Sequence, residues 1–565
     1  MALAVGVARS QQATAGSAAT AVPAPALAAQ IQALLAAPEL AQDHWGIAVA
    51  TLQGTRLYGL NEAQLLPPAS TTKLFTTAAA LALLGPERRW TTRLSYPAPA
   101  PGTHVVHGDV VLLGAGDASL NGRALPLAAN AATDTATATA TDAGAVPSPT
   151  PKPALEDFAD QLVAAGVRRI EGNIVGDDTA FPWEPYPPEW AVSDTMWGYG
   201  APISGLSVQE NQVQVVVSPG RRAGAPAQVR WVDTPSYGGA APPRPERPRG
   251  RMRPFYAVDA RALTTVAAGG TTQVGMDLPL GSRVLRVFGT IAEDATPVTE
   301  PIAIADPAEY AARLLTQLLR QRGVVVQGRP QARHAWPQSG QGLRSAVLEP
   351  LHLPTTPESL GAAAVVPPAP STPPVPQVCR AGCPVVLQNA SPTVAEDVVL
   401  TNKVSENLHA ELLLRHLGKE FGSEGSNTQG VRVLRQFARD AGVAPGELWL
   451  EDGSGLSGHD RATPQALVQL LVYAASQPWF EVWKQSLPVG GVDGTLRSRF
   501  AEQPLTGRVF AKTGTLAETR ALAGYVVAAS GHTVAFAVMV GDHLPGSRAE
   551  REAMDRVVAA IAATY

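Results

Sequence analysis

The chain has 565 residues, more than the roughly 250–300 residues at which a single hydrophobic core stops growing, so several domains are expected. Hydrophobic residues make up 45% of the chain and charged residues 16%, which excludes a wholly disordered or collagen-like protein. The 44 Lys and Arg residues against 48 Asp and Glu give a formal net charge of −4, so a chain-wide nucleic-acid-binding surface is disfavoured.

The first 24 residues are small and polar apart from one short apolar run, and they are predicted to be disordered or signal-like. Small residues of the kind found at signal cleavage sites follow the run, but no Lys or Arg precedes it. The segment therefore looks like a signal peptide that is incomplete or has a misassigned start. No window holds about eighteen uninterrupted apolar residues, so no membrane-spanning helix is expected.

The part of the chain that follows is predicted to hold two helices and a hairpin. Apolar residues at helical spacing predict a helix over residues 26–35. Two strand-like runs, 44–51 and 56–60, flank a Gln-Gly turn and predict the hairpin. A run rich in Ala and Leu over 70–84 is predicted to be a helix that ends at a Gly-Pro pair.

The C-terminal part is predicted to be helical first and to end in a three-stranded meander and a helix. If the N-terminal hairpin pairs with this meander, the two form one five-stranded antiparallel sheet, with the first and last helices together on one face. The expected fold class is therefore α/β and multidomain. The predicted helices cover 394–417 (broken near Thr401), 430–441, 464–476 and 547–563, and the strands cover 509–515, 521–529 and 533–540.

The middle of the chain is expected to be an excursion that interrupts this sheet domain. Strand-like runs alternate there with low-complexity stretches, which are predicted to be surface loops or linkers because they cannot bury enough apolar area. The Arg-rich stretch at 244–253 is expected to be a solvated loop, and binding of a polyanion is the alternative. The expected division is a discontinuous domain over 25–92 and 385–565, with two nested accessory domains rich in β-structure within 93–384. The low-complexity stretches lie near 125–153, 240–254 and 354–377.

The chain has two cysteines, Cys379 and Cys383. Their spacing allows a small disulfide loop, and free thiols are the main alternative. A tetrahedral zinc site needs two further ligands, which do not lie nearby in the sequence.

Lysine is rare, because only six of the 44 basic residues are lysines and the rest are arginines. Arginine keeps its proton in proteins, whereas burial can lower the pKa of a lysine until its amine acts as a base. Lys73 stands three residues after Ser70 at the start of a predicted helix, where the two side chains share a face. Ser70 is therefore a candidate nucleophile and Lys73 its base, and the alternative is that Ser70 only caps the helix.

Two further motifs hold polar side chains that could act on a substrate, and the first of them is KTG. Lys512-Thr513-Gly514-Thr515 lies in a predicted strand that would border a cleft, where the cation and hydroxyls suit a carboxylate and the glycine leaves room for a substrate. In isolation it is an ordinary strand end.

Ser405-Glu406-Asn407 lies in a turn between predicted helices, so its hydroxyl and amide can project together. Alone, this triplet indicates a helix cap. SxxK, SxN and KTG in that chain order, however, are the pattern of β-lactamases and penicillin-binding proteins.

From about residue 40 to the end, the chain resembles the D-alanyl-D-alanine carboxypeptidase/endopeptidases of peptidase family S13, the class C low-molecular-mass penicillin-binding proteins. The 332 positions from Lys73 to Ser405 leave room for the two additional domains of that family, whereas a β-lactamase has only a small helical subdomain there. Glu406 departs from the usual Asp of SxN, but its side chain is not expected to face the substrate. Family-like segments are 67–81, 112–120, 170–181, 199–220, 401–418, 451–457, 490–500 and 511–516.

The resemblance implies a serine D,D-peptidase that acts through an acyl-enzyme and needs no metal or organic cofactor. Ser70 would attack the penultimate D-Ala carbonyl of a peptidoglycan stem peptide and release the terminal D-Ala. The backbone N–H groups of Ser70 and Thr515 would form the oxyanion hole. Lys403 would either strengthen the local positive field or form a structural salt bridge. The implied catalytic residues are Ser70, Lys73, Ser405, Asn407 and Lys512, and the implied substrate-binding residues are Thr513, Gly514, Thr515 and Glu184, the last for the stem peptide's side-chain amine.

The resemblance also implies partners and a location. Peptidoglycan stem peptides would be substrates and β-lactam antibiotics inhibitors, in the periplasm or elsewhere outside the cytoplasm. The charge balance and the lack of a long apolar window separately argue against a nucleic-acid partner and a membrane-spanning segment. Whether the chain forms a homodimer stays open. The aromatic-rich segment 183–199 could line a groove for peptide or glycan, or could pack an inserted domain. The alternative functions are a β-lactamase-like hydrolase of the same fold and a non-catalytic cell-wall-binding scaffold.

Overall fold

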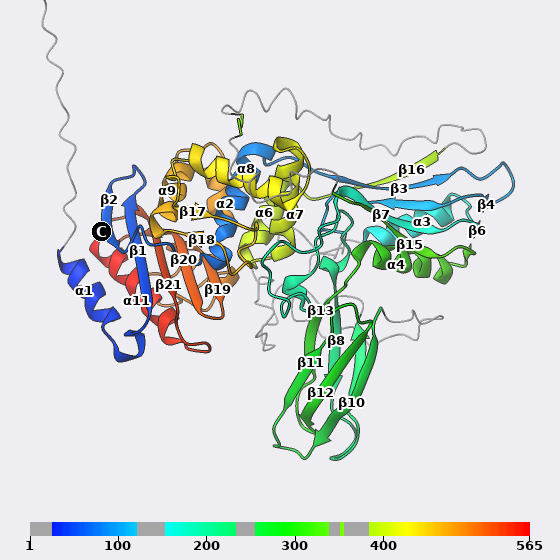
Figure 1. Cartoon of the computed structure of the whole chain (residues 1–565), viewed down its shortest axis with the longest axis horizontal. Coiled ribbons are helices and arrows are strands. Elements are labelled where there is room, and N and C mark those ends of the chain that lie inside the picture. Colours follow the sequence, from blue (N-terminus) through cyan, green and yellow to red (C-terminus); the bar gives the residue numbers. More distant parts are fainter. Residues whose placement is uncertain (1–24, 121–152, 233–254, 338–350, 355–383) are drawn as a thin grey trace, which may run out of the picture.

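The computed structural model describes residues 25–120, 153–232, 255–337, 351–354 and 384–565. The molecule is elongated, with one sheet domain at one end and the sheets of the middle of the chain at the other (Figure 1). Both cysteines, the predicted signal-like segment 1–24 and nearly all of the three low-complexity stretches lie outside the described residues.

The sheet at the first end joins the two ends of the chain. Its strand order is β19-β20-β21-β1-β2, and all neighbouring strands are antiparallel. The pairing of β1 with β21 sets Ile47 opposite Val538. The predicted five-stranded antiparallel sheet is therefore confirmed. The strands are β1 (His44–Thr51), β2 (Arg56–Leu60), β19 (Val509–Leu516), β20 (Thr519–Val527) and β21 (Thr533–Gly541).

Helices cover both faces of this sheet, and β21 shows how the sequence accommodates them. Phe536 and Val538 point into a core with α1 (Pro25–Leu35) and α11 (Ala549–Thr564), whereas Ala535 and Ala537 point into the larger core on the opposite face. Side chains of successive strand residues alternate between faces, so a strand buried on both sides is apolar throughout. The predicted pairing of the first and last helices is confirmed. The helices of the other core are α2 (Lys73–Ala79), α6 (Val394–Lys403), α7 (Asn407–Phe421), α8 (Asn427–Asp440), α9 (Pro464–Ala475) and α10 (Phe480–Ser486).

The middle of the chain forms further sheets. Its largest has the order β15-β7-β5-β3-β16, and the antiparallel pair β3 (Thr91–Pro97) and β16 (Pro384–Ala390) brings together the points where the chain leaves and re-enters the first domain. On this arrangement we propose the division into a discontinuous catalytic domain and an inserted region. The remaining strands are β4 (Val105–Val106), β5 (Val110–Leu113), β6 (Arg169–Ile170), β7 (Ile174–Pro182), β8 (Gln212–Ser218), β9 (Gln228–Val232), β10 (Ala257–Val266), β11 (Gln273–Asp277), β12 (Val284–Ala292), β13 (Val298–Ala303), β14 (Val325–Val326), β15 (Pro330–Ala335), β17 (Leu448–Trp449) and β18 (Arg461–Ala462).

Two helices of the inserted region were not predicted from the sequence. They are α3 (Ala154–Ala164) and α4 (Pro307–Gln321), and apolar residues of both lie in the core of this region. Of the helices in the described part of the chain, none combines the length and apolar character needed to cross a membrane. Short 3-10 turns are η1 (Pro38–Leu40), η4 (Gly198–Gly200), η5 (Gln209–Asn211) and η8 (Gly494–Leu496).

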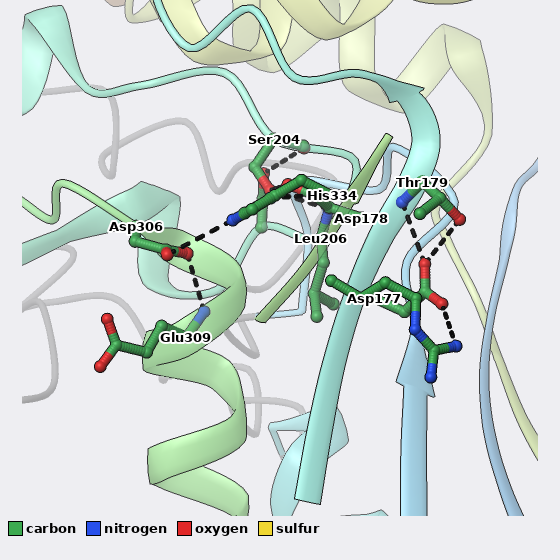
Figure 2. Close-up of polar contacts among 10 residues, drawn as sticks. Asp177, Asp178, Thr179, Ser204, Leu206, Asp306, Glu309 and His334 are labelled. Carbon is green, nitrogen blue, oxygen red and sulfur yellow. Dashed lines mark hydrogen bonds and ion pairs between the residues drawn. The ribbon is translucent and has the colours of Figure 1, made fainter. Parts of the chain in front are cut away.

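A largely buried polar cluster fixes the middle of β7 (Figure 2). His334 on β15 hydrogen-bonds the Asp178 carboxylate at 3.0 Å and lies 3.5 Å from Asp306, the N-cap of α4. Hydrogen bonds to Asp178 and then Asp306 raise the pKa of His334 to about 10, so the ring is a cation at neutral pH. Asp178 also accepts from the Ser204 hydroxyl at 2.9 Å, which ties a later segment back to the same point.

Candidate active site

Ser70 lies in a helical run that begins with a 3-10 turn, η2 (Ala69–Thr72), continues as α2 and ends with a π turn, η3 (Ala80–Leu84). The predicted helix over 70–84 is confirmed, although it is not α-helical throughout. Ser70 does not cap it, because neither η2 nor α2 has a side-chain cap hydrogen bond. Ala69 has a φ of 48°, a left-handed conformation that is uncommon for a residue with a side chain.

Two glycines allow the backbone to approach this turn. A Cβ on Gly455 would lie 1.8 Å from the Ala69 carbonyl oxygen, and one on Gly514 would lie 2.6 Å from that of Pro68. Both distances are far below van der Waals contact. The glycine of KTG therefore has a packing reason as well as the predicted one, because β19 lies directly against the Ser70 turn.

Lys73 is fully buried, and its amine has three partners. Its Nζ lies 3.0 Å from Ser70 Oγ, 2.6 Å from Asn407 Oδ1 and 2.7 Å from the Ser454 carbonyl oxygen. Burial lowers the pKa of Lys73 to about 8, and nearby carboxylates, Asp452 first, oppose that shift. At a pKa of about 8, about a tenth of the amine is neutral at pH 7 and able to accept a proton.

The SxN triplet forms the turn between α6 and α7. Ser405 has a φ of 63°, so this turn holds a residue in a conformation that costs of order 1–3 kcal/mol. Asn407 is the first residue of α7, and its amide is held on both sides: Oδ1 accepts from Lys73, and Nδ2 donates to the Tyr199 carbonyl oxygen at 2.8 Å. Tyr199 belongs to the inserted region, so that region contributes directly to the site.

KTG lies on β19, the edge strand of the five-stranded sheet. Lys512 is buried, and its Nζ donates to Ser405 Oγ at 2.8 Å and to the Thr513 carbonyl oxygen at 2.9 Å. The Thr513 hydroxyl lies 2.7 Å from that of Thr495, and Thr515 is exposed. The three motifs therefore form one continuous set of contacts, in which two lysines each hold a serine hydroxyl.

Lys403 forms the structural salt bridge that was one of its two expected roles. Its Nζ lies 2.6 Å from Asp493 Oδ2 and 2.7 Å from the Leu487 carbonyl oxygen. The pair joins the end of α6 to the loop that leads to Thr495. Sequence reasoning missed Thr495, although it lies in the family-like segment 490–500.

Three buried carboxyl groups, those of Glu411, Asp452 and Asp460, act electrostatically on Lys73, and the sequence analysis gave none of them a role. Burial raises the pKa of Glu411 to about 8 and raises that of Asp460 well above its ordinary value. The Glu411 carboxylate accepts from the backbone N–H groups of Gly453 and Ser454 at 3.0 and 2.8 Å. Glu411 and Asp452 lie in the family-like segments 401–418 and 451–457, but nothing in the sequence marks these acidic residues as buried.

Glu184 contacts a different set of residues from the other predicted site residues. Its carboxylate pairs with Arg415 of α7 and accepts from the backbone N–H of Asn427 at 2.9 Å. An amine on a stem peptide would have to compete with the buried Arg415 guanidinium for this carboxylate.

Comparisons with known proteins agree with this architecture. The model of the D-Ala-D-Ala carboxypeptidase 3 (S13) family matches residues 27–353 and 376–563. The D-alanyl-D-alanine carboxypeptidase of Actinomadura sp. (strain R39) is 29% identical over 525 residues, which are 91% of this chain and 80% of that protein.

Two solved structures of penicillin binding protein 4 from Haemophilus influenzae have the same fold. The first is 19% identical with a TM-score of 0.68, and the match covers 94% of this chain and 98% of that one. The second, a complex with a novel β-lactam, is 19% identical with a TM-score of 0.62, and the match covers 94% of this chain and 97% of that one. The chain therefore belongs to the D-Ala-D-Ala carboxypeptidase 3 (S13) family of serine-type D-Ala-D-Ala carboxypeptidases.

Proposed function

We propose that this chain is a serine D,D-peptidase that removes the terminal D-Ala from peptidoglycan stem peptides through an acyl-enzyme on Ser70. The observation that carries the proposal is the contact of one buried amine, that of Lys73, with both the Ser70 hydroxyl at 3.0 Å and the Asn407 amide at 2.6 Å. A nucleophile and base within hydrogen-bond reach, with the base oriented by a third group, is the arrangement that activates a serine.

Acylation begins with proton transfer from Ser70 Oγ to the neutral Lys73 amine. The Oγ attacks the penultimate D-Ala carbonyl, and the oxygen of the tetrahedral intermediate is stabilised by the backbone N–H groups of Ser70 and Thr515. Asn407 holds the amide on the acyl side of the substrate. Because the base is already in contact with the hydroxyl, little reorganisation precedes this step.

Release of D-Ala requires a proton on its leaving nitrogen. The Ser405 hydroxyl and Lys512, which lie 2.8 Å apart, pass on to this nitrogen the proton that Lys73 took from Ser70, so Ser405 and Lys512 end the step as they began and Lys73 is neutral again. Thr513 and Thr515 on the edge strand bind the terminal carboxylate, and Gly514 leaves room for the substrate backbone. Water then hydrolyses the acyl-enzyme and regenerates Ser70.

Cross-linked stem peptides present the same D-Ala carbonyl, so D,D-endopeptidase activity follows from the same site. A β-lactam presents a strained amide to the same nucleophile, and the complex of a neighbour with a β-lactam supports this inhibitor class. Such a substrate lies in the cell wall, so we propose an extracytoplasmic location, in the periplasm where the cell has one.

The proposal is tested by incubating the protein with labelled penicillin and mapping the modified residue by mass spectrometry. A stable adduct on Ser70, together with D-Ala release from a D-Ala-D-Ala peptide, is expected. A transient adduct with fast penicillin turnover would indicate a β-lactamase-like hydrolase instead. No adduct on any residue would indicate a non-catalytic wall-binding scaffold.

The low pKa of Lys73 predicts the pH dependence of acylation. The base is the neutral amine, whose fraction rises with pH, so kcat/KM should increase about tenfold per pH unit below the Lys73 pKa of about 8 and level off above it. The carboxyl groups whose charges act on Lys73, and which would raise its pKa, are those of Asp452, Glu411, Glu406 and Asp460. Second-order rate constants for penicillin acylation between pH 5.5 and 9.5 measure this, and a flat profile would contradict a lysine base.

A further inference from the structure

A segment of the inserted region, residues 183–204, reaches the active site, and we call it the arm. Both of its ends are fixed to the cluster around Asp178. At the first end, the backbone N–H of Trp183 donates to the Ala335 carbonyl, next to His334, at 2.6 Å. At the other end the Ser204 hydroxyl donates to Asp178 (Figure 2). The arm is therefore held at its base by the cluster of charges on β7 and β15.

Besides the contacts of Glu184, two contacts of the arm with the catalytic domain lie next to Lys73. The Trp190 indole N–H donates to Asp452 Oδ2 at 2.8 Å, and the Tyr199 carbonyl accepts from the Asn407 amide at 2.8 Å. Trp190 is 8% exposed and lies in a small apolar cluster with Phe181 and Leu412. This packing keeps the indole N–H aimed at the carboxylate.

Asp452 organises the loop 452–457. Its carboxylate accepts from the backbone N–H groups of Gly455 at 2.6 Å and Ser457 at 2.8 Å, in addition to the Trp190 indole. The same loop presents the Ser454 carbonyl to Lys73 at 2.7 Å. Trp190 thus links the inserted region, through one carboxylate, to the carbonyl that holds the catalytic amine.

The direction of the Lys73 lone pair depends on these contacts. A neutral amine has two N–H bonds and one lone pair. The Ser454 carbonyl accepts and cannot donate, and Asn407 presents its oxygen because its NH₂ group faces the Tyr199 carbonyl. When the two N–H bonds point at these acceptors, the lone pair points at the remaining partner, the Ser70 hydroxyl.

We propose that Trp190 is a positioning residue for acylation, which acts through Asp452 and the Ser454 carbonyl to direct the Lys73 amine at Ser70. The inference rests on the proposed function. It assigns to the inserted region a role in the chemistry that is separate from substrate binding. A displacement of about 1 Å at a base can slow a reaction about a hundredfold, so the contact is catalytically significant even though Trp190 touches no reacting atom.

The test is Trp190→Phe, which removes the indole N–H and keeps an aromatic ring in the apolar cluster. We expect the penicillin acylation constant to fall at least about tenfold, while the dissociation constant of the initial complex changes by less than about threefold. The pH midpoint of acylation should rise above that of the parent. Burial is the main cause of the low Lys73 pKa, and a loosened loop admits water.

The matched control is Trp231→Phe, the same substitution in β9, where the ring packs against Tyr256 in the core of the inserted region. It should leave the acylation constant within about twofold of the parent and the pH midpoint unmoved. Trp190→Phe behaving like this control would overturn the proposal. A slower rate with an unmoved pH midpoint would also overturn it, because a merely structural loss lowers the acylation rate constant at every pH and leaves the midpoint where it was.

Coupling supplies a second test. If Trp190 acts through Asp452, the double variant Trp190→Phe/Asp452→Asn should acylate within about twofold of Asp452→Asn alone. A rate reduced by the product of the two single effects would overturn the proposal.

Should Trp190→Phe fail to fold, Asp452→Asn alone must slow acylation at least about tenfold with unchanged initial binding, and a smaller effect overturns the proposal. The parent protein is assayed first. Absence of an adduct on its Ser70 would contradict the proposed function and the inference with it. The acylation rate constant of the variant relative to that of the parent tests the inference alone.

Discussion

Ser70→Ala should abolish both penicillin acylation and D-Ala release while leaving the fold intact. The hydroxyl is the only group in the proposed mechanism that forms the covalent bond, and water has no route to replace it in acylation. Within the described part of the chain its side chain hydrogen-bonds Lys73, and no helix depends on it as a cap. The loss of a single hydrogen bond to a partly exposed hydroxyl costs about 1–2 kcal/mol at most.

Mass spectrometry after penicillin treatment and a thermal melt measure the two halves of this prediction. Thr71→Ala is a suitable control, because its buried hydroxyl donates only to the Pro68 carbonyl at 2.7 Å and lies one residue away. It should perturb stability about as much as Ser70→Ala and keep the adduct. Covalent labelling that persists in Ser70→Ala would refute the assignment of the nucleophile.

The sequence predicts the strands of the catalytic sheet well because each strand is marked by residues within the strand itself and in its flanking turns. Each strand is a short apolar run bounded by turn residues, and both ends of the chain carry such runs. Lys73 and Ser70 are recognisable for a similar reason, since three positions on a helix place two side chains on one face. Rarity of lysine adds a chemical reason to examine Lys73 and Lys512.

The parts that the sequence does not predict are those that depend on backbone atoms or distant packing. The Ser454 and Tyr199 carbonyls contact the catalytic groups, yet a backbone carbonyl is present at every position and leaves no sequence signal. Glu411 and Asp452 are recognisable as unusual only once they are seen to be buried. Trp190 was part of an aromatic segment for which packing and groove-lining could not be distinguished, and its actual contact is a hydrogen bond to a carboxylate.

Lys73→Arg should lower penicillin acylation by several orders of magnitude, because charge alone cannot fill the role of this residue. Arginine keeps the cation, but with a pKa above about 12 it cannot accept the serine proton. The structure adds a steric reason: the amine is fully buried among three acceptors, and the larger planar guanidinium cannot occupy the same position as a compact ammonium.

The same substitution at Lys419 and Lys484 provides internal controls. Lys419 donates to the Ala180 carbonyl at 3.2 Å, and Lys484 lies over the rings of Phe480 and Phe510. Arginine preserves both kinds of contact, since it donates to carbonyls and stacks on aromatic rings, so these variants should acylate like the parent.

The decisive comparison is the rate rather than the yield of adduct, because a slow variant can still be labelled completely after long incubation. Stopped-flow or quenched acylation at about pH 9, where the parent amine is mostly neutral, gives the largest difference. If Lys73→Arg acylates within about tenfold of the parent, a barrier difference of only about 1.4 kcal/mol, then Lys73 is not the base. In that case the role of base would pass from Lys73 to Lys512 acting through Ser405, because these two residues form the other lysine–serine pair of the site.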